Sequence, residues 1–153
     1  MNHTIAESKE FCSHSADMIK LAAEKGIDIG VAPSYLSLQT VKENAGNMIV
    51  AAQDCHFANH GAYTGFVSIP MIKELGIDWC LVGHSERRLY AAETSLTCNR
   101  KIKALIENKM TVVYCVGESL ADFESGRTKS IVKEQLLIGL MDIAKEDTDK
   151  IVV

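Results

Sequence analysis

The sequence predicts a parallel α/β fold. Short apolar runs alternate along the chain with longer segments in which apolar residues recur at helical spacing. The runs are apolar throughout rather than alternating, which indicates strands buried on both faces of a parallel sheet. Helices between such strands connect them by right-handed crossovers. Two architectures share this pattern, an open doubly wound sheet and a closed (β/α)8 barrel, and periodicity alone does not separate them.

The first half of the chain contains two predicted strands. In chain order its elements are a helix over 11–22, a strand over 27–33 (IDIGVAP), a helix over 37–46, a strand over 47–53 (NMIVAAQ) and a loop over 54–65 (DCHFANHGAYTG). Gly26 follows the first helix as its C-cap, and Pro33 closes the first strand. The polar loop carries two glycines, Gly61 and Gly65, which is typical of irregular backbone.

The second half continues the alternation of helices and strands. Ser68 is predicted to cap a helix over 69–76 (IPMIKELG), with Pro70 in its first turn and Gly76 at its end. The later elements are a strand over 77–83 (IDWCLVG), a helix marked by Cys98, Ile102, Leu105 and Ile106, a strand over 110–117 (MTVVYCVG), a helix over 128–145 and the start of a fifth strand over 149–153 (DKIVV).

Length and charge favour one globular domain without a nucleic-acid or membrane partner. The chain has 153 residues, enough for one sizeable core, and a formal net charge of −4, which gives no basic surface for nucleic acid. No apolar run approaches the roughly 20 residues that a membrane span needs. The first residues do not have the cationic and apolar regions of a secretory signal.

The cysteines predict reduced thiols. There are five of them, an odd number, and two lie inside apolar runs, Cys80 and Cys115. This usage is typical of the cytosol, so we expect a cytoplasmic protein. Because the sequence contains no C-x-x-C pair, we expect no metal site.

Polar residues follow the predicted strands at their carboxyl ends, where both architectures place their chemistry. The end of the third strand is the richest, with Gly83-His84-Ser85-Glu86-Arg87-Arg88. No strand is followed by G-x-G-x-x-G or by G-x-x-x-x-G-K-[ST], which argues against a dinucleotide or nucleotide site built on a glycine loop.

His84 is the strongest candidate for a functional side chain. A single histidine at a helix start is more often satisfied by its neighbours than catalytic, but here Gly83 allows a tight turn and Ser85 and Glu86 can open a helix. The positive end of a helix dipole favours a neutral imidazole, which can donate a hydrogen bond to a substrate oxygen. Glu86 also fits as a first-turn carboxylate that complements the dipole.

Other polar residues have simpler interpretations. Arg87 and Arg88 are expected to pair with acidic groups at strand ends or at an interface, or else to attract an anionic substrate. His56 and His60 are four residues apart, but they fall in the glycine-containing loop, so we expect surface histidines rather than a metal pair.

Four segments resemble the triosephosphate isomerase family. They are VGHSERR after a strand, AAQDCHFANHGAYTGFVS upstream, YCVGESL downstream and VAPSYLSL, and the resemblance extends in order over residues 1–153. It implies a (β/α)8 barrel, of which this chain covers about strands 2–5 and the start of strand 6 as a single partial domain. It also implies interconversion of dihydroxyacetone phosphate and glyceraldehyde 3-phosphate through an enediolate, in a cytosolic glycolytic homodimer without a cofactor.

The resemblance assigns roles to individual residues. His84 matches the electrophile that polarises the substrate carbonyl, and Ser85 and Glu86 match its two supporting residues. Thr64, with Tyr63 and Gly65 beside it, matches the loop tip that crosses the dimer interface. Cys115 matches a cysteine that packs near the catalytic base.

Phe66 departs from the family pattern. The family usually has a glutamate there, which pairs with an arginine of the histidine-bearing stretch, here Arg87. With Phe66 in its place, we expect either that this side chain is buried or that the interface differs.

The resemblance matches the family's active-site lysine and catalytic glutamate to no residue of this chain. The family's lysine falls before the first residue, and its catalytic glutamate falls after Val153. We therefore expect a truncated isomerase that is inactive alone. The alternatives are a non-catalytic assembly or binding module and, less favoured, an unrelated doubly wound phosphate-binding domain.

Overall fold

The computed structural model describes residues 2–153, which form a five-stranded parallel sheet. Its strands are β1 (Gly30–Val31), β2 (Ile49–Ala52), β3 (Trp79–Val82), β4 (Thr111–Tyr114) and β5 (Ile151–Val152). They lie side by side in chain order, β1-β2-β3-β4-β5. In a doubly wound sheet the order in which strands are added reverses at a switch point, whereas in a (β/α)8 barrel each new strand lies beside the previous one on the same side. The strand order therefore selects the partial barrel.

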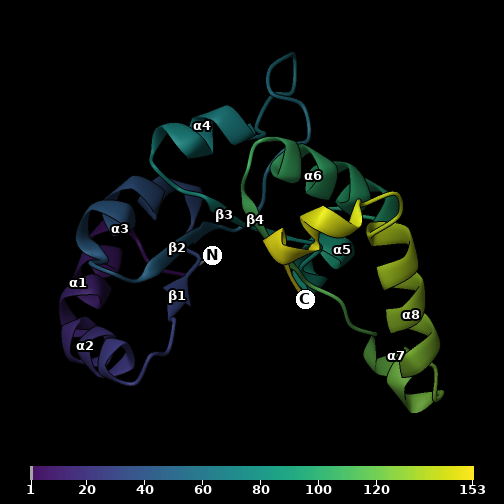
Figure 1. Cartoon of the computed structure of the whole chain (residues 1–153), viewed down its shortest axis with the longest axis horizontal. Helices are drawn as coiled ribbons and strands as arrows, with labels where there is room; N and C mark the ends of the chain where they lie inside the picture. The colour runs from purple at the N-terminus through teal and green to yellow at the C-terminus, as the bar shows by residue number, and fades with distance from the viewer. Residues whose placement is uncertain (1) are drawn as a thin grey trace.

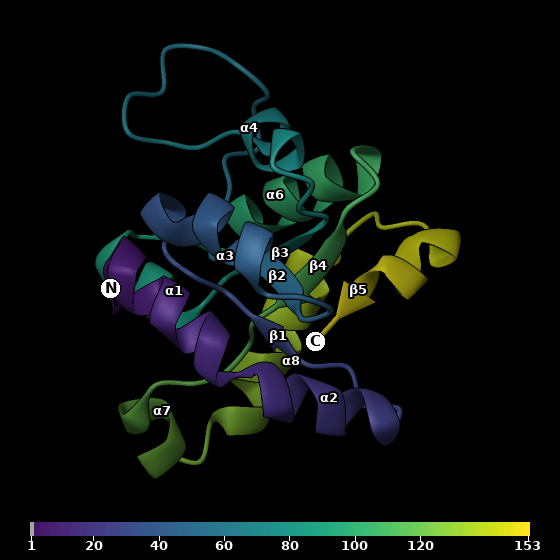
Figure 2. The ribbon, with the colours of Figure 1, turned by 90° about the vertical axis from the view of Figure 1, so that its left-hand side faces the viewer.

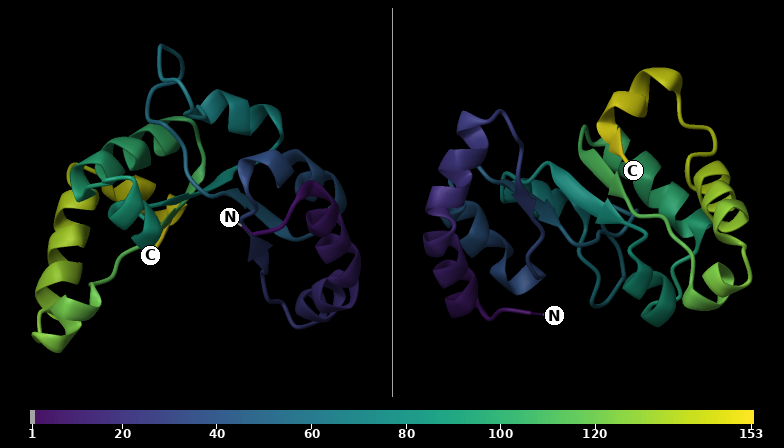
Figure 3. Two further views of the ribbon diagram at one scale, coloured as in Figure 1. Left: turned by 180° about the vertical axis from the view of Figure 1, so that it is seen from behind. Right: turned by 90° about the horizontal axis from the view of Figure 1, so that it is seen from below.

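Helices cover one face of the curved sheet (Figures 1 and 3). They are α1 (Ile5–His14), α2 (Ala16–Glu24), α3 (Leu38–Asn44) after a 3-10 turn η1 (Tyr35–Ser37), α4 (Ile69–Glu74), α5 (Ser85–Tyr90), α6 (Ser95–Glu107), α7 (Leu120–Glu124), α8 (Thr128–Gly139) and the 3-10 segment η2 (Lys145–Lys150). None of the helices in the described part of the chain is long and apolar enough to span a membrane.

The predicted alternation of helices and strands is confirmed, with changes in where some helices end. The helix predicted over 11–22 is two helices that meet at Ser15, the C-cap of α1 and N-cap of α2. The helix predicted over 128–145 ends at Gly139 instead. A Cβ at Gly139 would lie 2.1 Å from the Tyr114 hydroxyl oxygen, so this residue lets α8 approach β4 closely.

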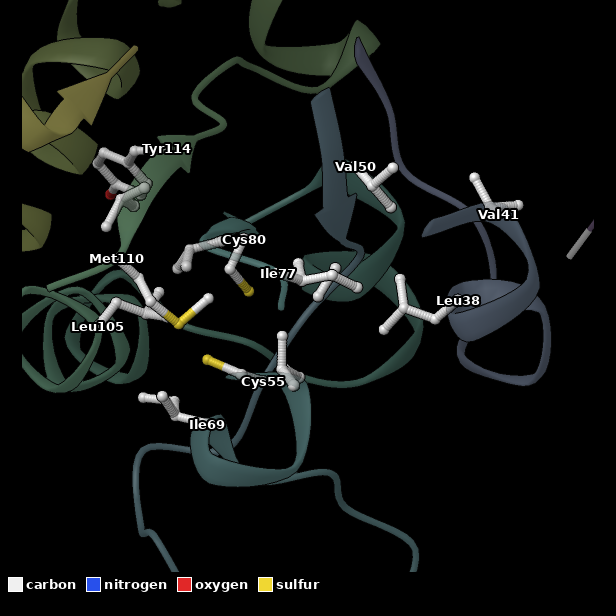
Figure 4. Close-up of a cluster of buried hydrophobic side chains, with 14 of the residues drawn as sticks. Leu38, Val41, Val50, Cys55, Ile69, Ile77, Cys80, Leu105, Met110 and Tyr114 are labelled. Atoms are coloured by element: carbon white, nitrogen blue, oxygen red, sulfur yellow. The ribbon is translucent and has the colours of Figure 1, made fainter. Parts of the chain in front are cut away.

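The core lies between the sheet and its helices, and Figure 4 shows part of it. Its buried side chains include Leu38, Val41, Val50, Cys55, Ile69, Ile77, Cys80, Leu105, Met110 and Tyr114. All five cysteines are free thiols, four of them buried and Cys115 half-buried, which confirms the prediction of unpaired cysteines. Burial raises the pKa of the Cys98 thiol to about 11.

The expectation that the strands are buried on both faces is only partly correct. In β3 and β4, buried residues such as Cys80 and Val112 alternate with half-buried ones such as Leu81 and Val113. Alternate side chains of a strand point to opposite faces of the sheet. The buried residues lie on the face that the helices cover, and the half-buried residues lie on the other face.

Candidate active site

His84 lies at the carboxyl end of β3, where it is the N-cap of α5. Its Nδ1 accepts a hydrogen bond from the backbone N–H of Glu86 at 3.3 Å. Because Nδ1 accepts this bond, a neutral imidazole carries its proton on Nε2. The side chain is 44% exposed, so that Nε2 proton is a hydrogen-bond donor at an accessible strand end.

The two residues after His84 form the first turn of α5. A carboxylate oxygen of Glu86 lies 3.8 Å from Nδ1 of His84, and the Glu86 side chain is 73% exposed. Ser85 is exposed as well. The structure therefore brings the three predicted catalytic residues together on one turn, and Glu86 acts on His84 mainly through its backbone N–H.

Arg87 pairs with acidic groups, as one of the two sequence interpretations predicts. Its Nη2 lies 2.9 Å from Oδ2 of Asp54, which follows β2, and its Nε lies 3.9 Å from Oε2 of Glu93. Asp54 therefore supplies the carboxylate that faces Arg87. Of the two alternatives for Phe66, burial does not hold: its side chain is 52% exposed, and its ring packs against that of His56 in an edge-to-face arrangement with centroids 4.8 Å apart.

Arg88 extends to the other side of the turn. Its Nε donates to the carbonyl oxygen of Gly83 at 2.9 Å, and its Nη1 donates to the Ser95 hydroxyl at 3.2 Å. Its Nη2 donates to the Cys115 carbonyl and the Tyr114 hydroxyl, both at 3.4 Å. Both arginines thus join strand ends to α5 and are occupied with internal partners.

A buried ion cluster of Asp54, Glu93 and Lys101 lies beneath this turn. Lys101 Nζ donates to Oδ1 of Asp54 at 2.6 Å and to Oε1 of Glu93. Burial opposes the charge of Lys101, but the two carboxylates outweigh it and raise its pKa. Burial also raises the pKa of Asp54, while Lys101 and Arg87 act in the opposite direction.

Sequence reasoning missed Glu93 and Lys101 as parts of the site. One signal was present for Lys101: it shares the apolar stripe of α6 with Cys98, Ile102 and Leu105, and all four side chains are buried. A lysine on the buried stripe of a helix requires a buried partner. Glu93 stands in the connection between α5 and α6 and carried no comparable pattern.

The predicted dimer-interface residues, Tyr63, Thr64 and Gly65, are exposed on the loop between β2 and α4. This loop projects from the body of the molecule (Figure 2), and the His56 N–H closes its base by donating to the Val67 carbonyl at 2.8 Å. The structure does not place the loop tip among the residues around His84.

The prediction of surface histidines is correct for His60 and wrong for His56. His56 is 7% exposed because its ring packs against Phe57, Tyr63 and Phe66, with ring centroids 4.1–4.8 Å away. Its Nδ1 accepts the backbone N–H of Ala58 at 3.0 Å. His56 is therefore a structural residue of the loop.

Comparison with known proteins matches the whole chain to one family. A sequence model described as "Triosephosphate isomerase" matches residues 1–153. The triosephosphate isomerase of Clostridium botulinum (strain ATCC 19397 / Type A) is 37% identical over 155 residues, which cover 100% of this chain and 61% of that protein. That of Chlorobium chlorochromatii is 42% identical over 151 residues, which cover 94% and 59%. The chain thus spans about 60% of the length of these relatives.

Proposed function

Because the chain belongs to the triosephosphate isomerase family, we propose that it carries the electrophilic half of an isomerase site. The reaction is the interconversion of dihydroxyacetone phosphate and glyceraldehyde 3-phosphate. One observation supports this proposal above all: His84 is held at the end of β3 with Nδ1 as an acceptor, which leaves Nε2–H as the donor.

The chemistry follows from that donor. A hydrogen bond from Nε2–H to the substrate carbonyl oxygen draws electrons from the carbonyl carbon and makes the neighbouring C–H more acidic. The same bond strengthens when that proton leaves and negative charge develops on the oxygen of the enediolate. Glu86 fixes the tautomer through its backbone N–H, and Ser85 occupies the same turn. The resemblance assigns neither the base nor the lysine to residues 1–153.

A chimaera tests this function. Residues 1–153 replace the matching segment of the Clostridium botulinum relative, and circular dichroism verifies that the product is folded. We expect the chimaera to isomerise glyceraldehyde 3-phosphate in a coupled assay. His84→Gln should lower its kcat by about 10²-fold or more, because a preorganised donor is lost.

The matched control is His14→Gln, which alters an exposed histidine on α1 and should leave kcat unchanged. A folded chimaera whose turnover is the same with and without His84 would refute the electrophile role. The polypeptide of residues 1–153 alone should give only background turnover, since the resemblance supplies it with no base.

The homodimer, the glycolytic setting and the cytoplasmic location belong to the same proposal. The exposed loop tip around Thr64 supports a contact with a second copy, since Tyr63 and Phe66 expose aromatic surface there. Light scattering on the chimaera should give the mass of a dimer. Thr64→Arg should shift it towards the monomer, and an unchanged dimer would argue against contact at the loop tip.

One observation favours the alternative of a non-catalytic assembly module. Among the described strands, β1 and β5 each have a neighbour on one side only. Open parallel edges can pair with further strands. A folded chimaera without turnover, together with concentration-dependent association of residues 1–153, would favour this module over the isomerase.

A further inference from the structure

His84 is oriented by its backbone. The contacts of its imidazole, to the N–H and carboxylate of Glu86, lie within its own turn. The direction of the ring therefore depends on the turn formed by Gly83 and on whatever holds that turn in place.

Gly83 is tightly enclosed. Its φ is +79°, a region that favours glycine. A Cβ at this position would lie 2.9 Å from Nη2 of Arg88, 3.0 Å from the carbonyl oxygen of Cys115 and 3.1 Å from Sγ of Cys98. The turn at Gly83 therefore has no room for a side chain, and the atoms packed around it restrict its backbone conformation.

Both backbone polar groups of Gly83 are held by side chains. Glu93, which is 8% exposed, accepts its N–H through Oε2 at 3.2 Å, and Arg88 Nε donates to its carbonyl oxygen at 2.9 Å. Each side chain is anchored in turn: Glu93 accepts from Lys101 with its other oxygen, and Arg88 also bonds the Cys115 carbonyl beyond β4.

We propose that Glu93 and Arg88 are positioning residues for His84, which aim the imidazole by holding the N–H and the carbonyl of Gly83. The proposal rests on the electrophile role of His84 for its purpose. If the ion cluster had only a structural role, loss of the Gly83 contacts would leave the His84 ring in place. The proposal predicts instead that loss of these contacts changes the orientation of the ring.

Glu93→Gln is the decisive variant. The carboxylate accepts from Lys101 with one oxygen and from Gly83 with the other, whereas an amide has a single oxygen. Charged Lys101 takes that oxygen, and the Gly83 N–H then faces an NH2 group. Asp54→Asn is the matched control, because it weakens the same cluster at Lys101 and Arg87 without touching Gly83.

The measurement uses the ¹⁵N-labelled chain of residues 1–153, with amide hydrogen exchange at Gly83 and the ¹⁵N and ¹H signals of the His84 ring. In Glu93→Gln we expect exchange at Gly83 about tenfold faster than in Asp54→Asn, as for an amide that has lost its acceptor. The ring signals of His84 should shift in Glu93→Gln and keep their wild-type positions in Asp54→Asn.

Arg88→Lys provides a second, independent variant that keeps the charge and loses the forked contacts. It should shift the His84 ring signals, whereas Arg100→Lys on the exposed side of α6 should not. If Glu93→Gln does not fold, the comparison of Arg88→Lys with Arg100→Lys tests the proposal. Unchanged ring signals in Arg88→Lys and in a folded Glu93→Gln, or an equal shift in Asp54→Asn, would overturn the proposal. A chimaera without turnover would refute the isomerase function and leave this result unaffected.

Discussion

Replacing Lys101 by methionine should destabilise the fold far more than a typical lysine substitution. The Lys101 side chain is 6% exposed, and it lies between two carboxylates, Asp54 and Glu93, that are 5% and 3% exposed. Methionine conserves most of the volume but leaves those charges without their shared cation. Removing one partner of a buried ion pair costs about 3–5 kcal/mol.

The structure places the expected value at the lower end of that range. Arg87 still faces Asp54 at 2.9 Å, and Glu93 keeps its bond from the Gly83 N–H, so each carboxylate retains one donor. We therefore expect Lys101→Met to lower the free energy of unfolding by about 3 kcal/mol. Urea denaturation followed by fluorescence of the single tryptophan, Trp79 in β3, measures this change.

Two further variants test the reasoning. Lys103→Met changes the same residue type two positions along α6, where the pair with Asp142 is 3.5 Å long and largely exposed, and should cost less than about 1 kcal/mol. Adding Glu93→Gln to Lys101→Met removes the uncompensated charge and should recover about 1 kcal/mol. A loss below about 1 kcal/mol for Lys101→Met would refute the account of the buried cluster.

Three other predictions concern pH, packing and thiol reactivity. Burial opposes the charge of Lys101, but its carboxylate partners raise its pKa above the ordinary value of 10.5, so its stabilising contribution should be complete below that pH. In urea titrations at alkaline pH, the stability difference between wild type and Lys101→Met should be constant from about pH 8 to about pH 10 and shrink above it; a difference that grows at high pH would contradict the sign. Gly139→Ala should lower stability by about 1–3 kcal/mol because its Cβ would overlap the Tyr114 hydroxyl, while Gly117→Ala, which meets nothing within 4 Å, serves as the control in the same denaturation assay. Cys115 is half-buried, whereas the other four cysteines are buried, so its thiol should be the first to react with a disulfide reagent. Cys115→Ser should remove the fastest kinetic phase of this labelling. If that phase persists in Cys115→Ser, another cysteine becomes accessible first.

Much of the local structure could be predicted because it depends on neighbours in the sequence. His84 follows an apolar strand and Gly83 and precedes a helix, and the structure confirms this order. The boundaries were less predictable. The stripe over 11–22 continues through Ser15, where its hydroxyl donates to the Phe11 carbonyl at 2.7 Å and α1 gives way to α2.

The sequence by itself determined the alternation of helices and strands, the position of His84 at a strand end and the family to which the chain belongs. These depend on periodicity and on short motifs, which are local. Only the tertiary structure decided that Asp54 is the partner of Arg87 and that Lys101 lies between Asp54 and Glu93. Lys101 and Asp54 are 47 residues apart, and such contacts arise only when the sheet brings its carboxyl ends together.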